Sequence, residues 1–167
     1  MRKGDRMNTI VLYATKHGAS LELARKIASQ IGSAKLVDLN DIKRVSTLDL
    51  SQFDCVIVGS SVYAGQVRPA AKHFVTKNAD LLMTKRLGLF IVGLDTKNAE
   101  LAFASNFPKE LRESAQAQLC AGGIFDPEKA NFAERRIVKA ILKSSDYVDT
   151  FDDEKIASFV QELRKSS

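Results

Sequence analysis

The chain has few prolines, glycines, cysteines and histidines and no long apolar run, and each shortage excludes a class of protein. Three prolines and nine glycines in 167 residues leave little room for a disordered or low-complexity segment. No apolar run approaches the length of about 20 residues that a helix needs to cross a bilayer. The first six residues, MRKGDR, are polar and lack the apolar stretch of a secretory signal. These absences predict a cytoplasmic protein.

Two cysteines and two histidines offer few ligands for a metal ion. Cys55 and Cys120 lie far apart, each inside an apolar run, and their spacing matches no common metal or redox motif. We interpret both as buried thiols that behave as small hydrophobic side chains, which fits a reducing compartment. Only His17 and His73 could add imidazole ligands, so we expect no metal site.

What the chain does contain is a regular alternation of apolar runs and amphipathic stretches. Apolar runs predict buried strands at residues 10–13, 35–39, 53–58, 87–94 and 119–125. Helical spacing predicts helices over residues 21–31, from Pro69, from Pro108, and over residues 132–143 and 153–164. The alternation predicts an α/β fold, a doubly wound parallel sheet with helices on both faces. The 45% hydrophobic content suits a single domain, placed at residues 9–167 after an N-terminal extension of residues 1–8.

The segment TIVLYATKHGAS, residues 9–20, is the most informative part of the chain. An apolar run ends in a short polar turn from Thr15 to Ser20, and a helical pattern begins at once. The start of a helix has unpaired backbone N–H groups and a dipole that favour anions. The turn adds hydroxyls, a cation and a glycine, so we expect it to bind a phosphate. The alternative is an ordinary strand–helix turn in which Ser20 caps the helix.

Two spaced patterns resemble the flavodoxin family. Residues 11–15, followed by Gly18, Ser20, Ala24 and Ile27, are similar to the family's signature for the phosphate of flavin mononucleotide (FMN), with Ser20 in place of the usual threonine. The run DCVIVGSSVYAG, residues 54–65, falls where the family places its first loop against the isoalloxazine ring. The resemblance implies an open five-stranded flavodoxin-like sheet with strand order 2-1-3-4-5 and one FMN bound noncovalently.

The resemblance also implies which residues contact FMN, in three loops. The phosphate residues are Thr15, Lys16, His17, Gly18, Ala19 and Ser20; the ring residues are Ser60, Ser61, Val62, Tyr63, Ala64 and Gly65; the pyrimidine-side residues are Leu94, Asp95, Thr96 and Asn98. We expect Lys16 to be a solvent-exposed accessory charge and His17 a polar loop residue rather than a catalyst. Tyr63 either stacks on the ring or is a surface aromatic residue at a loop tip.

Later segments are similar to the branch of the family that contains menaquinone-dependent protoporphyrinogen dehydrogenase. They are GSSVYAGQVRPAAKHFV, LCAGGIFDPEK, ERRIVKAILK and DYVDTFDDEKIASFV. The resemblance implies an FMN-dependent oxidoreductase of heme biosynthesis in which the flavin carries the chemistry and no protein side chain is catalytic. Two alternatives stay open: a small electron carrier that acts with a separate reductase, and a flavin-binding interaction module.

The chain is basic, with a formal net charge of +5 and a pI of about 9.2. The first six residues contribute three cations and one anion, so the charge without them is still +3. Flavodoxins that serve as carriers are acidic and dock on basic reductases, and a basic chain suits an anionic partner instead. The partners considered are a propionate-bearing tetrapyrrole, an acidic protein, and an anionic membrane surface that holds a quinone.

The helix predicted over residues 132–143 has a basic side and an apolar side. The basic side carries Arg135, Arg136, Lys139 and Lys143, and the apolar side carries Ile137, Val138, Ile141 and Leu142. One interpretation is a solvated face above a stripe that packs on the core. The other is peripheral contact with acidic headgroups on the inner face of a membrane. Nucleic acid is not an expected partner, since no basic patch is interleaved with aromatic residues.

Overall fold

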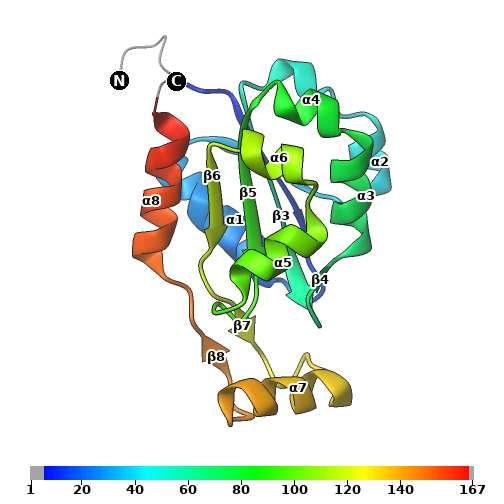
Figure 1. Ribbon diagram of the computed structural model, residues 1–167, viewed down its shortest axis with the longest axis vertical. Helices are drawn as coiled ribbons and strands as arrows, with labels where there is room; N and C mark the ends of the chain where they lie inside the picture. Colours follow the sequence, from blue (N-terminus) through cyan, green and yellow to red (C-terminus); the bar gives the residue numbers. More distant parts are fainter. Residues whose placement is uncertain (1–5, 166–167) are drawn as a thin grey trace.

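The computed structural model describes residues 6–165, which form an open parallel sheet covered by helices on both faces (Figure 1). Its parallel strands are β1 (Thr9–Ala14), β2 (Ala34–Asp38), β3 (Cys55–Tyr63), β5 (Arg86–Val92) and β6 (Ala117–Cys120), in the order β2-β1-β3-β5-β6. This order confirms the predicted doubly wound topology. A short strand that was not predicted, β4 (Gln66–Val67), pairs antiparallel with the end of β3. Of the extension expected over residues 1–8, residues 1–5 lie outside the described part.

Strands β1 and β5 are almost entirely apolar, as expected where helices cover both faces of the sheet. Every residue of β1 is buried, and in β5 only Arg86 is partly exposed. On one face lie α1 (Ala19–Ile31) and α8 (Asp153–Arg164), which pack on the sheet beside each other. No helix within residues 6–165 combines the length and the apolar character needed to span a bilayer.

The other face of the sheet is covered by several shorter helices. They are α2 (Ile42–Ser46), the 3-10 turn η1 (Leu50–Gln52), α3 (Pro69–Lys77), α4 (Ala79–Met83), α5 (Ala99–Asn106) and α6 (Lys109–Ser114). Local sequence sets several boundaries as predicted. Gly32 ends α1 in a left-handed conformation with a φ of 94°, and Pro69 opens α3 at a first-turn position that needs no N–H donor.

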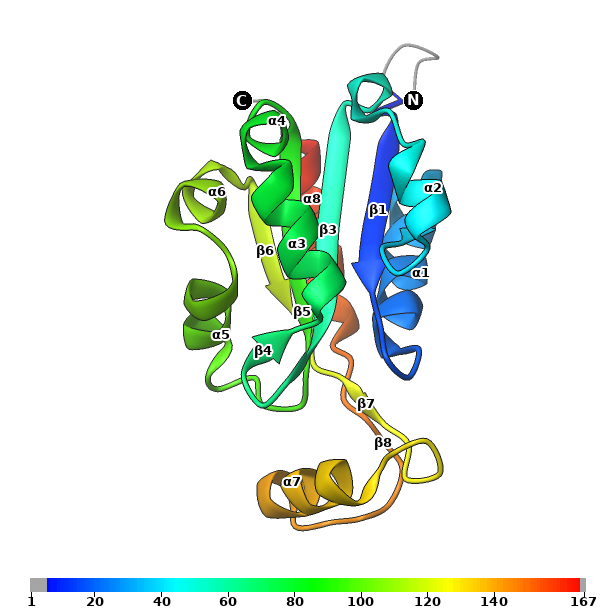
Figure 2. The ribbon, with the colours of Figure 1, turned by 90° about the vertical axis from the view of Figure 1, so that its right-hand side faces the viewer.

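The strand predicted over residues 119–125 is wrong at residues 121–123, because β6 ends at Cys120 and residues 124–125 form a separate strand. Gly122 has a φ of 103°, a conformation that interrupts an extended strand, and the chain leaves the sheet there. It continues as β7 (Ile124–Phe125), α7 (Phe132–Leu142) and β8 (Val148–Asp149), and β7 pairs antiparallel with β8. We call residues 124–149 the α7 arm. Figure 2 shows this arm projecting beyond the end of the sheet on the β7–β8 ribbon.

Candidate functional site

A cavity of about 400 Å³ lies between the carboxyl ends of the strands and the α7 arm. Its floor is formed by three loops, at residues 15–19 after β1, 61–65 at the end of β3, and 93–95 after β5. These loops follow the strands at which a doubly wound sheet places its ligands. Its roof is formed by the α7 arm, which contributes Phe125, Ala130, Glu134, Ile137, Val138, Ile141 and Tyr147.

The loop after β1 presents the start of α1 to the cavity. Gly18 is the N-cap of the helix, with a φ of 96° that favours glycine, and its N–H donates to Thr15 Oγ1 at 2.9 Å. The first helical hydrogen bond runs from the Glu22 N–H to the Gly18 carbonyl. The N–H groups of residues 19–21 therefore precede the helical ladder and have no acceptor within it. Such a helix start is favourable for an anion.

Ser20 lies in the first turn of α1 and is fully buried, so its side chain does not line the cavity. The N-cap is Gly18, which shows that the alternative of Ser20 as the capping residue is wrong. Ser20 Oγ has no hydrogen-bond partner among the described residues. A buried hydroxyl without a partner is unfavourable by about 1–3 kcal/mol. The donors that face the cavity are the bare N–H groups of the helix start, and these fit the acceptor oxygens of a phosphate monoester.

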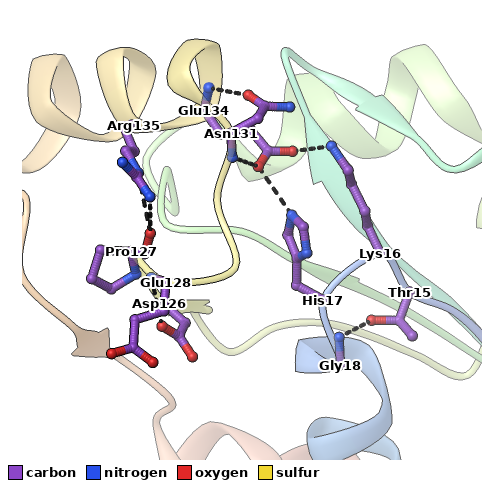
Figure 3. A network of polar contacts seen from close by, with 10 residues as sticks. All are labelled: Thr15, Lys16, His17, Gly18, Asp126, Pro127, Glu128, Asn131, Glu134 and Arg135. Atoms are coloured by element: carbon purple, nitrogen blue, oxygen red, sulfur yellow. Dashed lines mark hydrogen bonds and ion pairs between the residues drawn. The ribbon is translucent and has the colours of Figure 1, made fainter.

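Glu134 joins the α7 arm to the loop after β1 (Figure 3). Lys16 Nζ donates to Glu134 Oε1, and His17 Nε2 lies 3.0 Å from Glu134 Oε2. The Asn131 N–H donates to the same Oε2 at 2.9 Å, and the Glu134 N–H donates back to Asn131 Oδ1, which completes a capping box at the start of α7. We call these contacts the Glu134 latch. Lys16 is thus not merely the exposed accessory charge we expected, and its Nζ also lies 5.8 Å from the centroid of the Tyr63 ring.

The latch holds the carboxylate of Glu134 in its ionised form. Burial alone would raise the pKa of Glu134, but hydrogen bonds from Lys16, the Asn131 backbone and His17 outweigh that effect and lower it to about 2. The carboxylate already pairs with the Lys16 ammonium and contacts the His17 ring. A phosphate bound there would therefore depend chiefly on the helix start and the hydroxyls rather than on free positive charge.

Replacing Glu134 by Gln should loosen the α7 arm while leaving the capping box in place, because Gln also serves at that position. The ion pair with Lys16 is lost, and we expect the local stability of the arm to fall by about 1 kcal/mol, since the partners are partly exposed. Hydrogen–deuterium exchange of residues 132–142 measures this directly, as about fivefold faster exchange. Glu113→Gln, which removes an exposed ion pair with Lys109, is the matched control.

The wild type and Glu134→Gln also test how the latch depends on pH. The pKa of Glu134 is lowered from 4.5 in the unfolded chain to about 2 in the folded protein, so the stabilisation is complete above pH 4.5 and disappears as the pH falls towards 2. The difference in exchange between wild type and Glu134→Gln should stay constant above pH 4.5 and shrink below it. If the difference in exchange rate did not change on acidification, the latch would not be an ionic contact.

The residues expected beside the flavin ring divide into two groups. Ser61, Val62, Tyr63, Ala64, Gly65, Leu94 and Asp95 line the cavity, whereas Ser60, Thr96 and Asn98 do not. Residues 59–63, expected as a loop, continue strand β3, because residues 59–61 still pair with the neighbouring strands and β4 pairs with Val62 and Tyr63. Ser60 is buried, and its hydroxyl accepts from the Arg68 N–H at 2.9 Å and donates to the Ser61 carbonyl. Its side chain therefore supports the hairpin and does not face the cavity.

Beyond the three loops, the cavity wall includes Cys120 at the end of β6. Burial raises the pKa of the Cys120 thiol, and it raises the pKa of Cys55, inside the core, to about 11. Neither cysteine is activated as a thiolate nucleophile. The chemistry that this arrangement supports is the binding and orientation of a reactive ligand.

The roof is the part of the site that sequence reasoning missed. One of the two interpretations of this helix placed its apolar residues on the core, and neither placed them over a cavity, which Ile137, Val138 and Ile141 line. Only one residue of α7, Glu134, is buried. One local signal was available: Asn131 and Glu134 have the spacing of a capping box, which marks a helix start at the observed position. Nothing local indicated that Glu134 would reach a loop more than a hundred residues away.

Comparison with known proteins finds a matching family model, relatives in sequence and similar structures. A family model described as "Flavodoxin domain" matches residues 10–151. Protoporphyrinogen IX dehydrogenase [quinone] of Escherichia coli K12 is 24% identical over 172 residues, covering 94% of each chain. Flavodoxin 2 of Bacillus cereus superposes with a TM-score of 0.59 at 17% identity, over 93% of this chain and 97% of that one. A WrbA-like flavodoxin from Agrobacterium tumefaciens gives 0.55 at 15% identity, over 95% and 98%.

Proposed function

Because this chain belongs to the flavodoxin domain family, we propose that it is an FMN-dependent oxidoreductase that delivers reducing equivalents to a quinone. FMN is the cofactor, and the protein is a flavodoxin-like redox protein. The observation that carries the proposal is the floor of the cavity. It combines a bare helix start at Gly18, the Thr15 side chain and the end of β3 at one edge of the sheet.

The residues on the floor suit different parts of FMN. Backbone N–H groups at the start of α1 and the hydroxyl of Thr15 would hold the phosphate, with Gly18 allowing close approach. Tyr63 and the backbone of residues 61–65 would flank the ring, and Asp95, fixed by a 2.7 Å hydrogen bond from Asn98 Nδ2, would lie towards its polar end. The bound flavin supplies the redox chemistry. The protein binds it, orients it and limits the access of water.

The proposed substrates come from the Escherichia coli relative, which matches over nearly its whole length. By its name, that enzyme oxidises protoporphyrinogen IX with a quinone. Both compounds are largely apolar, and the roof presents Ile137, Val138 and Ile141 to the cavity. In each turnover the porphyrinogen would lose two electrons and two protons, and the quinone would leave as the quinol.

Cofactor binding is tested by titrating the protein with FMN and with riboflavin in a calorimeter. We expect one FMN per chain and an affinity for riboflavin at least about tenfold lower, because riboflavin lacks the phosphate that the helix start favours. Equal affinities would place the phosphate outside the loop after β1. Failure of both ligands to bind the folded protein would contradict the proposed cofactor site altogether.

The redox proposal is tested separately, with the FMN-loaded protein under anaerobic conditions. Protoporphyrinogen IX and menaquinone should together give porphyrin fluorescence. Omission of the quinone should limit the porphyrin to less than the amount of flavin present, because each flavin accepts two electrons and full oxidation of one porphyrinogen takes several such steps. Porphyrin formation that does not require the quinone would point to another acceptor. No porphyrin, together with rapid turnover only when a separate reductase is added, would favour the electron-carrier alternative.

A further inference from the structure

The outward side of α7 is a surface that the cavity does not use. Ile137, Val138 and Ile141 lie on the side of the helix that faces the cavity. Phe132, Arg136, Lys139 and Lys143 are spaced by four, three and four residues, so they share the opposite side. Because the arm projects beyond the sheet, this side faces away from the body of the molecule (Figure 2). We call these four residues the outer face of α7.

The charged side chains of α7 are mostly basic. Residues 124–149 carry five acidic and five basic side chains, but Glu134 is the single acid on α7, and it is held in the latch. Within residues 6–165, none of the three cations of the outer face forms an ion pair. Arg135, by contrast, donates twice to the Pro127 carbonyl and belongs to the structure of the arm. The outer face therefore carries three unneutralised positive charges.

A large apolar side chain lies among these charges. Phe132 is 75% exposed, and the Arg136 guanidinium lies 5.8 Å from the centroid of its ring. A helix that combines cations with an exposed aromatic residue has the composition of helices that lie at the lipid–water interface. The end of a projecting arm can reach a flat surface without obstruction from the domain.

We propose that the outer face of α7 docks on an anionic lipid bilayer, with its three cations at the headgroups and Phe132 at the boundary of the acyl chains. A bilayer explains both features, whereas a soluble acidic protein would account for the charges without needing the projecting aromatic residue. Docking would place the cavity, on the other side of the same helix, about one helix diameter from a medium that dissolves apolar redox partners. The surface itself is independent of which substrate the cavity takes.

Sedimentation with vesicles tests the docking surface without any assay of activity. The full-length, FMN-loaded protein should sediment with vesicles of phosphatidylglycerol and phosphatidylcholine but not with phosphatidylcholine alone, and added salt should weaken binding. The triple variant Arg136→Glu, Lys139→Glu, Lys143→Glu should bind at least about tenfold more weakly. Phe132→Ala should lower binding to a smaller extent, and that loss should persist when salt is raised.

The matched control is the triple variant Lys43→Glu, Lys72→Glu, Lys77→Glu, which reverses three exposed cations on α2 and α3 and changes the net charge equally. It should keep most of the binding. Equal losses in the two triple variants would overturn the proposal, because the effect would then be one of net charge. So would a wild-type protein that sediments with neither kind of vesicle, including one that binds an acidic protein instead.

Discussion

Ala19→Asp should fold at least as well as the wild-type protein and yet bind FMN at least about 100-fold more weakly. Ala19 is the first residue of α1 and lines the cavity, directly after the N-cap Gly18. An acidic side chain at a helix start is favourable by about 0.3–1 kcal/mol, and Lys16 and His17 lie in the same loop. The same carboxylate would repel a phosphate dianion or occupy its place. Stability and cofactor affinity should therefore change in opposite directions.

An acidic substitution at Ala19 tests cofactor binding with less effect on folding than the same substitution at Ser20. Ser20 is fully buried, so a charge there would threaten the fold as well as the site. For Ala19→Asp, calorimetric titration gives the affinity and thermal unfolding gives the stability. Ala19→Asn, of similar size and without charge, should keep most of the affinity for FMN. Riboflavin should bind Ala19→Asp as it binds the wild type. An equal loss for riboflavin would show that the substitution disturbs the cavity rather than the phosphate.

The sheet could be predicted from the sequence because its signals are local. Runs such as residues 10–13 are continuous and apolar, as strands covered on both faces require, and Gly32 and Pro69 mark helix boundaries by their own backbone preferences. The loop after β1 was likewise predictable, since a strand end, a glycine and a helix start follow one another within a few residues. These features need no information about distant parts of the chain.

The roof of the cavity could not be predicted, because its place depends on contacts distant in sequence. The apolar side of α7 reads as a core-facing stripe, and no residue of the helix itself reveals that the stripe covers a cavity. Its position follows from the Glu134 latch and from the break at Gly122, which turns the chain out of the sheet. The pair of glycines in AGGIF was a visible signal of that break, but the apolar residues around it favoured one continuous strand.

Gly122→Ala should be the most disruptive single-methyl change at the base of the arm, with an expected loss of about 3 kcal/mol or more. Gly122 has a φ of 103°, and an added Cβ would lie 2.4 Å from the carbonyl oxygen of Thr150 and 2.7 Å from its hydroxyl. Thr150 holds the base of the arm, because its N–H donates to the Gly123 carbonyl at 2.9 Å and its hydroxyl accepts from the Gly123 N–H at 3.0 Å. The methyl group therefore forces these two segments apart.

Separating them should move the roof of the cavity, so Gly122→Ala should also release FMN faster, as stopped-flow dilution would measure. Gly32→Ala is the matched control, because Gly32 has a φ of 94° with no atom within 4 Å of an added Cβ, far from the arm. Gly32→Ala should cost about 1–2 kcal/mol of backbone strain without a clash like that with Thr150, and it should leave FMN release unchanged. If both variants lost the same stability and released FMN at the same rate, the contact with Thr150 would not be what holds the arm over the cavity.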